Sequence, residues 1–123
     1  MKKIIYLQKI GDLNPTTLIK LKKGLKRALK KYIVSVKILK DKIPFANFPY
    51  NPITKQYNGS YILDKLAYKV KNKNQFRTLG ILNKDIYAGT YDFIFGKAYY
   101  PKNEFLKYHA VALISVARLK EKF

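Results

Sequence analysis

Apolar and polar residues follow two different periods over the first forty residues of the chain. Residues 3–10 (KIIYLQKI) are rich in β-branched and apolar side chains and end before Gly11, which is typical of a strand. Asn14 and Pro15 then form a helix-start signal. Apolar residues recur after it at three- and four-residue spacing, at Leu18, Leu21, Leu25, Ala28, Leu29 and Tyr32. Residues 32–39 return to β-branched side chains, so the pattern predicts a β-α-β unit with parallel strands.

The rest of the chain predicts one more helix and several strands. Residues 40–60 contain three prolines and indicate an ordered loop, because four aromatic side chains there are unfavourable to leave in water: Phe45, Phe48, Tyr50 and Tyr57. Residues 62–70 place apolar side chains on one stripe of a second helix. Strands are predicted at residues 77–82, 85–87, 93–99 and 110–115. We find neither a repeat nor a linker, so the pattern predicts a single α/β domain over residues 1–123.

Composition adds bounds on the class of protein. The chain is 48% hydrophobic and has eleven Tyr and seven Phe, which is typical of a folded domain. No apolar run approaches the roughly 20 residues of a membrane-spanning helix. The N-terminus also lacks the apolar stretch of a signal peptide, so we expect a cytoplasmic protein that does not enter membranes. The absence of cysteine excludes disulfides and thiolate ligands.

The net charge of +19 raises the possibility of a polyanionic partner. The polar side of the first predicted helix gives a candidate binding face, composed of Lys20, Lys23, Lys26, Arg27, Lys30 and Lys31, and Tyr99 and Tyr100 could add stacking surface. However, 23 of the 26 basic residues are Lys, whereas nucleic-acid recognition favours the guanidinium fork of Arg. Lysine-rich composition also fits a genome poor in G and C. A small basic nucleic-acid-binding protein is therefore the alternative, and a solvated helix face is favoured over it.

The sequence contains no motif that is typical of a catalytic or phosphate-binding site. His109 is the single histidine, and its serine neighbours in sequence show no nucleophile elbow. The seven acidic residues are scattered, and Asp85 and Asp92 are expected in turns. The six glycines are isolated and form no phosphate-binding loop. We therefore predict no catalytic residue and no metal ligand.

Four segments in order along the chain resemble the archaemetzincins, which are compact zinc metallopeptidases of the metzincin clan. Residues 51–58 (NPITKQYN) resemble their "R.QYns" segment, with Thr54 in place of the arginine. Residues 79–87 (LGILNKDIY) resemble "lgit..Dly", and residues 93–98 (FIFGKA) resemble "fvFGxA". Residues 111–119 (VALISVARL) resemble "vvS..RL". The resemblance extends from the first strand to Leu119.

The resemblance implies the upper subdomain of a metzincin: a twisted, mostly parallel mixed sheet of about five strands, with an antiparallel edge strand and two backing helices. In the family, a helix with the zinc motif H-E-x-x-H-x-x-G-x-x-H follows the "RL" segment, whereas this sequence ends at Phe123. We therefore expect a truncated, incomplete metallopeptidase domain without zinc and without proteolytic activity of its own.

Partners also follow from the resemblance. The missing helix would cover the other face of the sheet, so we expect self-association or a downstream-encoded chain that carries the zinc helix. The family binds its peptide substrate along the antiparallel edge strand. The matching residues, expected to bind peptide weakly, are Phe93, Ile94, Phe95, Gly96, Lys97 and Ala98.

Overall fold

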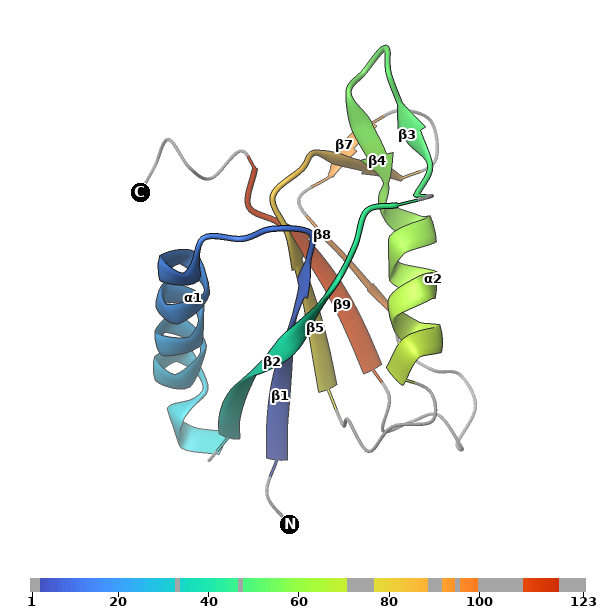
Figure 1. The fold of residues 1–123 in the computed structure, drawn as a ribbon. Coiled ribbons are helices and arrows are strands. Elements are labelled where there is room, and N and C mark those ends of the chain that lie inside the picture. The colour runs from blue at the N-terminus through green and yellow to red at the C-terminus, as the bar shows by residue number, and fades with distance from the viewer. Residues whose placement is uncertain are drawn as a thin grey trace.

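The protein is a twisted sheet with one helix on either side (Figure 1). The structure is a computed structural model, and it describes residues 3–32, 34–46, 48–70, 77–88, 92–94, 96–99 and 110–117. The main sheet has the strand order β2-β1-β5-β9-β8. These strands are Val34–Ile43 (β2), Lys3–Ile10 (β1), Arg77–Leu82 (β5), Ala110–Ser115 (β9) and Gly96–Tyr99 (β8).

Four strands of the main sheet run parallel and the fifth is antiparallel. β1 lies between β2 and β5, with Leu7 opposite both Ile38 and Leu79. β9 pairs with β5 in parallel register, and β8 pairs with β9 in antiparallel register. The predicted fold class, a mostly parallel mixed sheet with an antiparallel edge strand and two helices, is confirmed.

Helix α1 (Pro15–Ala28) starts where the sequence signal places it. The Asn14 side chain accepts a hydrogen bond from the Thr16 amide at 2.9 Å, and Pro15 occupies the first turn, where its missing amide is not needed. A short 3₁₀ helix, Lys30–Tyr32, follows. The apolar side of α1 packs on one face of the main sheet. There Leu18 of the helix forms a buried cluster with Leu7, Val36 and Ile81 of the strands.

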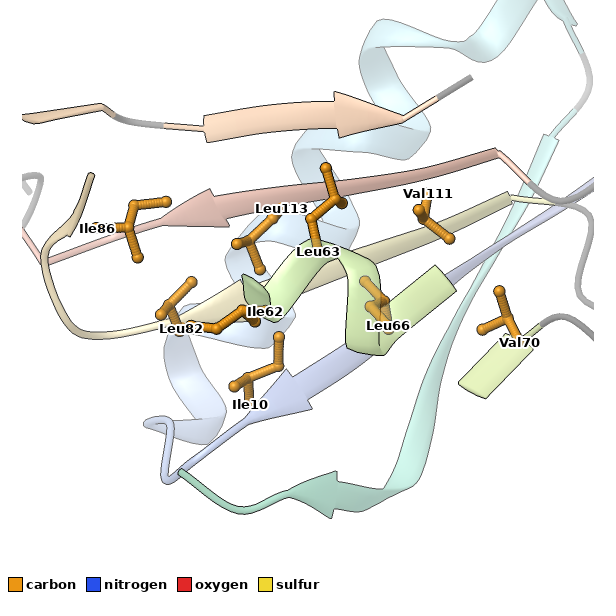
Figure 2. Close-up of a cluster of buried hydrophobic side chains, with 9 residues drawn as sticks. All are labelled: Ile10, Ile62, Leu63, Leu66, Val70, Leu82, Ile86, Val111 and Leu113. Carbon is orange, nitrogen blue, oxygen red and sulfur yellow. The ribbon is translucent and has the colours of Figure 1, made fainter. Parts of the chain in front are cut away.

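Helix α2 (Gly59–Val70) covers the opposite face. The Asn58 side chain caps it by accepting from the Tyr61 amide at 3.1 Å. The helix packs closely because Gly80 of β5 lies beneath it: a Cβ there would approach the Leu66 side chain to 2.9 Å. Figure 2 shows the resulting cluster of Ile10, Ile62, Leu63, Leu66, Val70, Leu82, Ile86, Val111 and Leu113.

A second, four-stranded sheet lies at the N-terminal end of α2, in the order β3-β4-β6-β7. Its strands are Tyr50–Asn51 (β3), Gln56–Asn58 (β4), Ile86–Ala88 (β6) and Asp92–Ile94 (β7). The predicted loop over residues 40–60 is thus ordered, but it contains a hairpin that the prediction missed. Phe45 stacks on Tyr57 at a centroid distance of 4.6 Å, whereas Tyr50 is 46% exposed.

Two expectations from the sequence need correction. The single strand predicted at residues 93–99 is two strands, because β7 pairs with β6 in the second sheet and β8 pairs with β9 in the main sheet. The expectation that one face of the sheet lacks a helix is also wrong, because α1 and α2 pack on opposite faces. Within the ranges given above, neither helix is long and apolar enough to cross a membrane.

Candidate functional site

An apolar groove runs between α1 and the end of β9. Its volume is about 610 Å³, and Leu13, Leu21 and Leu25 form the wall on the α1 side. Ile114 and Val116 form the opposite wall. These five side chains are only partly buried and belong to the margin of the α1 cluster. Helix α1 therefore covers the part of this sheet face that β1 and β2 form, and it leaves apolar surface open towards β9.

Two features of the groove lack an explanation within the fold of the described residues. Gly24 lines it, and a Cβ at this position would meet nothing within 4 Å. A glycine inside a helix destabilises it by roughly 0.5–1 kcal/mol relative to alanine. Asn83 also lines the groove, and its Oδ1 is buried without a hydrogen-bond partner in the described part of the chain. Both features are consistent with an occupant that approaches α1 closely.

Hydrogen bonds after β9 fix the wall of the groove. The Val116 amide donates to the Leu82 carbonyl at 2.9 Å, which extends the pairing of β9 with β5. Ser115 Oγ donates to the Lys84 carbonyl at 2.6 Å and accepts from the Ala117 amide at 3.2 Å. Ser115 is thus a structural residue of this turn, although its sequence position made it a candidate partner for His109, which lies outside the described residues.

The predicted peptide-binding segment is divided between the two sheets. Phe93 and Ile94 belong to β7 and pair with β6, and Phe95 lies outside the described residues. Gly96, Lys97 and Ala98 belong to β8, which ends the strand order of the main sheet. β7 likewise ends the strand order of the second sheet, so both described parts of the segment lie in antiparallel edge strands, but of two different sheets.

The predicted cationic face is present on α1 and the 3₁₀ helix. All six of its residues are exposed: Lys20, Lys23, Lys26, Arg27, Lys30 and Lys31. The two ion pairs found among the described residues involve other lysines, Lys42 with Asp12 and Lys69 with Asp41. The hydrogen bond and the charge of Lys42 lower the pKa of Asp12 below its usual value. Tyr99 lies in β8, and Tyr100 is outside the described residues.

The described residues do not fit a zinc site. They contain no group of three His, Cys, Asp or Glu side chains that could bind a metal ion. Nitrogen, sulfur and carboxylate ligands in such a group are what zinc requires. We therefore derive no catalytic step through a metal from this part of the chain.

Comparison with known proteins finds relatives of this chain. No family model matches the chain. The curated archaemetzincin of Methanopyrus kandleri is 33% identical over 89 residues, which is 72% of this chain. This chain is an archaemetzincin homologue. The match covers 45% of the Methanopyrus protein, so the chain spans about half the length of its curated relative.

Solved structures agree with this homology. The crystal structure of the Methanopyrus kandleri archaemetzincin matches with a TM-score of 0.67 at 26% identity, covering 96% of this chain and 60% of the other. A zinc-dependent peptidase from Methanocorpusculum labreanum matches with a TM-score of 0.64, covering 94% of this chain and 64% of the other. At 24% identity, the second match shows the fold alone. The resemblance predicted from the four sequence segments is thus confirmed.

The sequence analysis did not predict the groove. Its walls come from α1 and from residues after β9, which are far apart in the sequence. One signal was available in Gly24, because it interrupts a run of good helix formers without ending the helix. Asn83 offered no such signal, because an Asn between two strands is expected in a turn.

Proposed function

We propose that this chain forms the N-terminal part of an archaemetzincin-like metallopeptidase and that a further segment completes it. This segment would supply the zinc motif and pack in the groove beside α1. It could belong to a longer form of the chain or to a downstream-encoded partner. The chain without it would cleave no peptide, because three metal-binding side chains do not meet in the described part.

The groove is the observation that carries this proposal. It is apolar, it lies on the side of α1 that faces β9, and Gly24 lets another backbone approach. Val116 is at once part of its wall and the first residue after β9. In the Methanopyrus structure, this chain covers 60% of the protein, so the relative contains further residues that could occupy the equivalent place.

Strand β8 supports the substrate side of the proposal. It is antiparallel to β9 and ends the strand order, so one row of its backbone groups faces away from the described strands of the sheet. An extended peptide can add to such an edge through main-chain hydrogen bonds. Peptide binding to Gly96, Lys97 and Ala98 would be weak here, because one strand edge without a metal provides few contacts. Phe93 and Ile94 belong to an edge of the second sheet, so a peptide paired with β8 would not continue along them in the same sheet.

The experiment compares the chain alone with the chain co-purified with the polypeptide encoded immediately downstream. Molar mass by light scattering and zinc content by elemental analysis are measured on both. We expect one zinc ion per stable complex and none bound to the chain alone. Stoichiometric zinc on the chain alone would contradict the proposal, and failure to form a complex would contradict its version with a downstream-encoded partner.

A groove-filling substitution makes the test specific. Gly24→Phe would direct a ring into the groove, and a Cβ at this position meets nothing within 4 Å. Lys26→Phe is the matched control, because Lys26 is exposed on α1 and does not line the groove. We expect Gly24→Phe to abolish the complex and Lys26→Phe to preserve it. Equal effects would show that the groove is not the contact surface.

A further inference from the structure

The proposed role of the groove does not explain the cationic face of α1. Among its six residues, Lys20 alone lines the groove. Positions 20, 23 and 27 are three and four residues apart, so they form one row along the helix, with a rise of about 1.5 Å per residue. Lys30 and Lys31 extend the row into the 3₁₀ helix. The row therefore spans about 16 Å.

These cations have no carboxylate partner among the described residues. Helix α1 contains no acidic residue in its first turn, and the ion pairs described above are made elsewhere. Lys26 and Arg27 in the last turn have a structural role, because positive charge there stabilises the helix dipole. This role does not account for Lys20 and Lys23 at the middle of the helix. Their mutual repulsion is relieved by counterions or by an anionic ligand.

The surface at the end of the row combines positive charge with an exposed aromatic side chain. An open hollow is lined by Arg27, Ala28, Lys30 and Lys31. Beside it, Tyr32 is 54% exposed, and Lys31 Nζ lies over one face of its ring, 5.2 Å from the centroid. Cations that follow a backbone, together with an exposed aromatic ring for stacking, are the two elements by which proteins bind single-stranded nucleic acid.

A membrane is a less suitable ligand for this face. A helix that binds a bilayer inserts its apolar side among the lipids. In α1 the apolar side faces the sheet and the groove and not the cationic row, because Leu18 is buried and Leu21 and Leu25, which line the groove, pack against the cluster on the sheet. The cations also form a narrow row, which matches the linear arrangement of phosphates on one strand.

We infer that the cationic row of α1, with Tyr32 at its end, binds single-stranded nucleic acid through the phosphate backbone. Binding is independent of base sequence, because the row offers charge and stacking and no base-specific donor set. It requires no metal, and Lys20 is the one residue of the row that also lines the groove.

The test is fluorescence anisotropy with a labelled 12-nucleotide oligo-dT at several salt concentrations. Each phosphate contact contributes about −0.7 to the slope of log K against log salt for single strands. We therefore expect a slope of about −3 to −4 for the wild-type chain, and a slope shallower by about 2 for the variant Lys23→Gln/Arg27→Gln/Lys30→Gln. Tyr32→Ala should weaken binding about fivefold or more at constant slope.

A charge-matched control separates this row from the overall charge. Lys37, Lys65 and Lys84 are exposed and lie on β2, on α2 and after β5, outside the cationic row. Their triple substitution by Gln removes the same charge and should preserve the slope. Circular dichroism checks that all variants are folded. Equal loss in both triple variants, or tighter binding to phosphatidylserine vesicles than to oligo-dT, would overturn the inference, as would no binding at about 0.05 M salt.

Discussion

Gly11 and Gly24 differ in what the fold requires of them. Gly11 follows β1 with a φ of +69°, which favours glycine, and a Cβ there would lie 2.1 Å from the Phe45 ring. Its amide also donates to the Ile43 carbonyl at 2.7 Å. Gly24, by contrast, has helical geometry and open space around it. The same residue type is thus a structural requirement at one position and a cost in stability at the other.

Alanine substitutions should therefore have opposite effects at the two positions. We expect Gly11→Ala to lower the free energy of unfolding by at least about 2 kcal/mol, through backbone strain and displacement of the Phe45 ring. Gly24→Ala should raise it by about 0.5–1 kcal/mol, because alanine favours the helix. Urea denaturation of both variants measures this. A loss of stability in Gly24→Ala would mean that the helix needs the glycine for itself.

At the level of elements, one buried polar side chain joins α2 to an irregular strand pair. Between Leu7 and Lys9 the register of β1 against β2 shifts, so that three residues of β2 lie opposite Gln8. Gln8 is fully buried, and its Nε2 donates to the carbonyls of Lys9 and Asp41 at 3.1 Å. Lys69 of α2 donates to Gln8 Oε1 at 2.7 Å. Both polar atoms of the Gln8 side chain therefore have hydrogen-bond partners, one in the strand pair and one in α2.

Removing the α2 donor should destabilise the protein. Lys69→Met leaves Gln8 Oε1 without this donor and also removes the ion pair with Asp41, so we expect a loss of about 1–2 kcal/mol in the free energy of unfolding. Lys65→Met, one turn earlier on the exposed side of α2, should change it by less than about 0.5 kcal/mol. Thermal and urea unfolding of the two variants give the comparison. Equal losses would indicate helix propensity and not the hydrogen bond as the cause.

How much of each element could be predicted depends on the range of the interactions that form it. α1 was predictable because Asn14, Pro15 and the apolar spacing act locally. The division of residues 93–99 was not, because it depends on pairing with β6 on one side and β9 on the other. The groove was unpredictable for the same reason, whereas the exposure of the α1 cations follows from periodicity alone. Local sequence signals thus predict single helices and strands, whereas the groove depends on contacts between residues far apart in the sequence.

At the level of the whole molecule, net charge and the open groove act against each other. The charge of +19 keeps copies of the chain apart, whereas apolar surface favours association. We expect self-association of the isolated chain to increase with salt, because salt screens the repulsion. Light scattering at about 0.05 M and 0.5 M salt measures this. A monomer at high concentration in both would show that the groove does not drive association.

The position of β9 in the sheet also sets an order of events during synthesis. β9 is the last described strand along the chain, yet it lies between β5 and β8. When the ribosome has released residues as far as β8, this strand still lacks its neighbour in the main sheet. Val111 and Leu113, which complete the cluster beneath α2, have also not emerged. The main sheet is therefore incomplete until residues 110–115 have emerged, and the nascent chain stays open to chaperones until then.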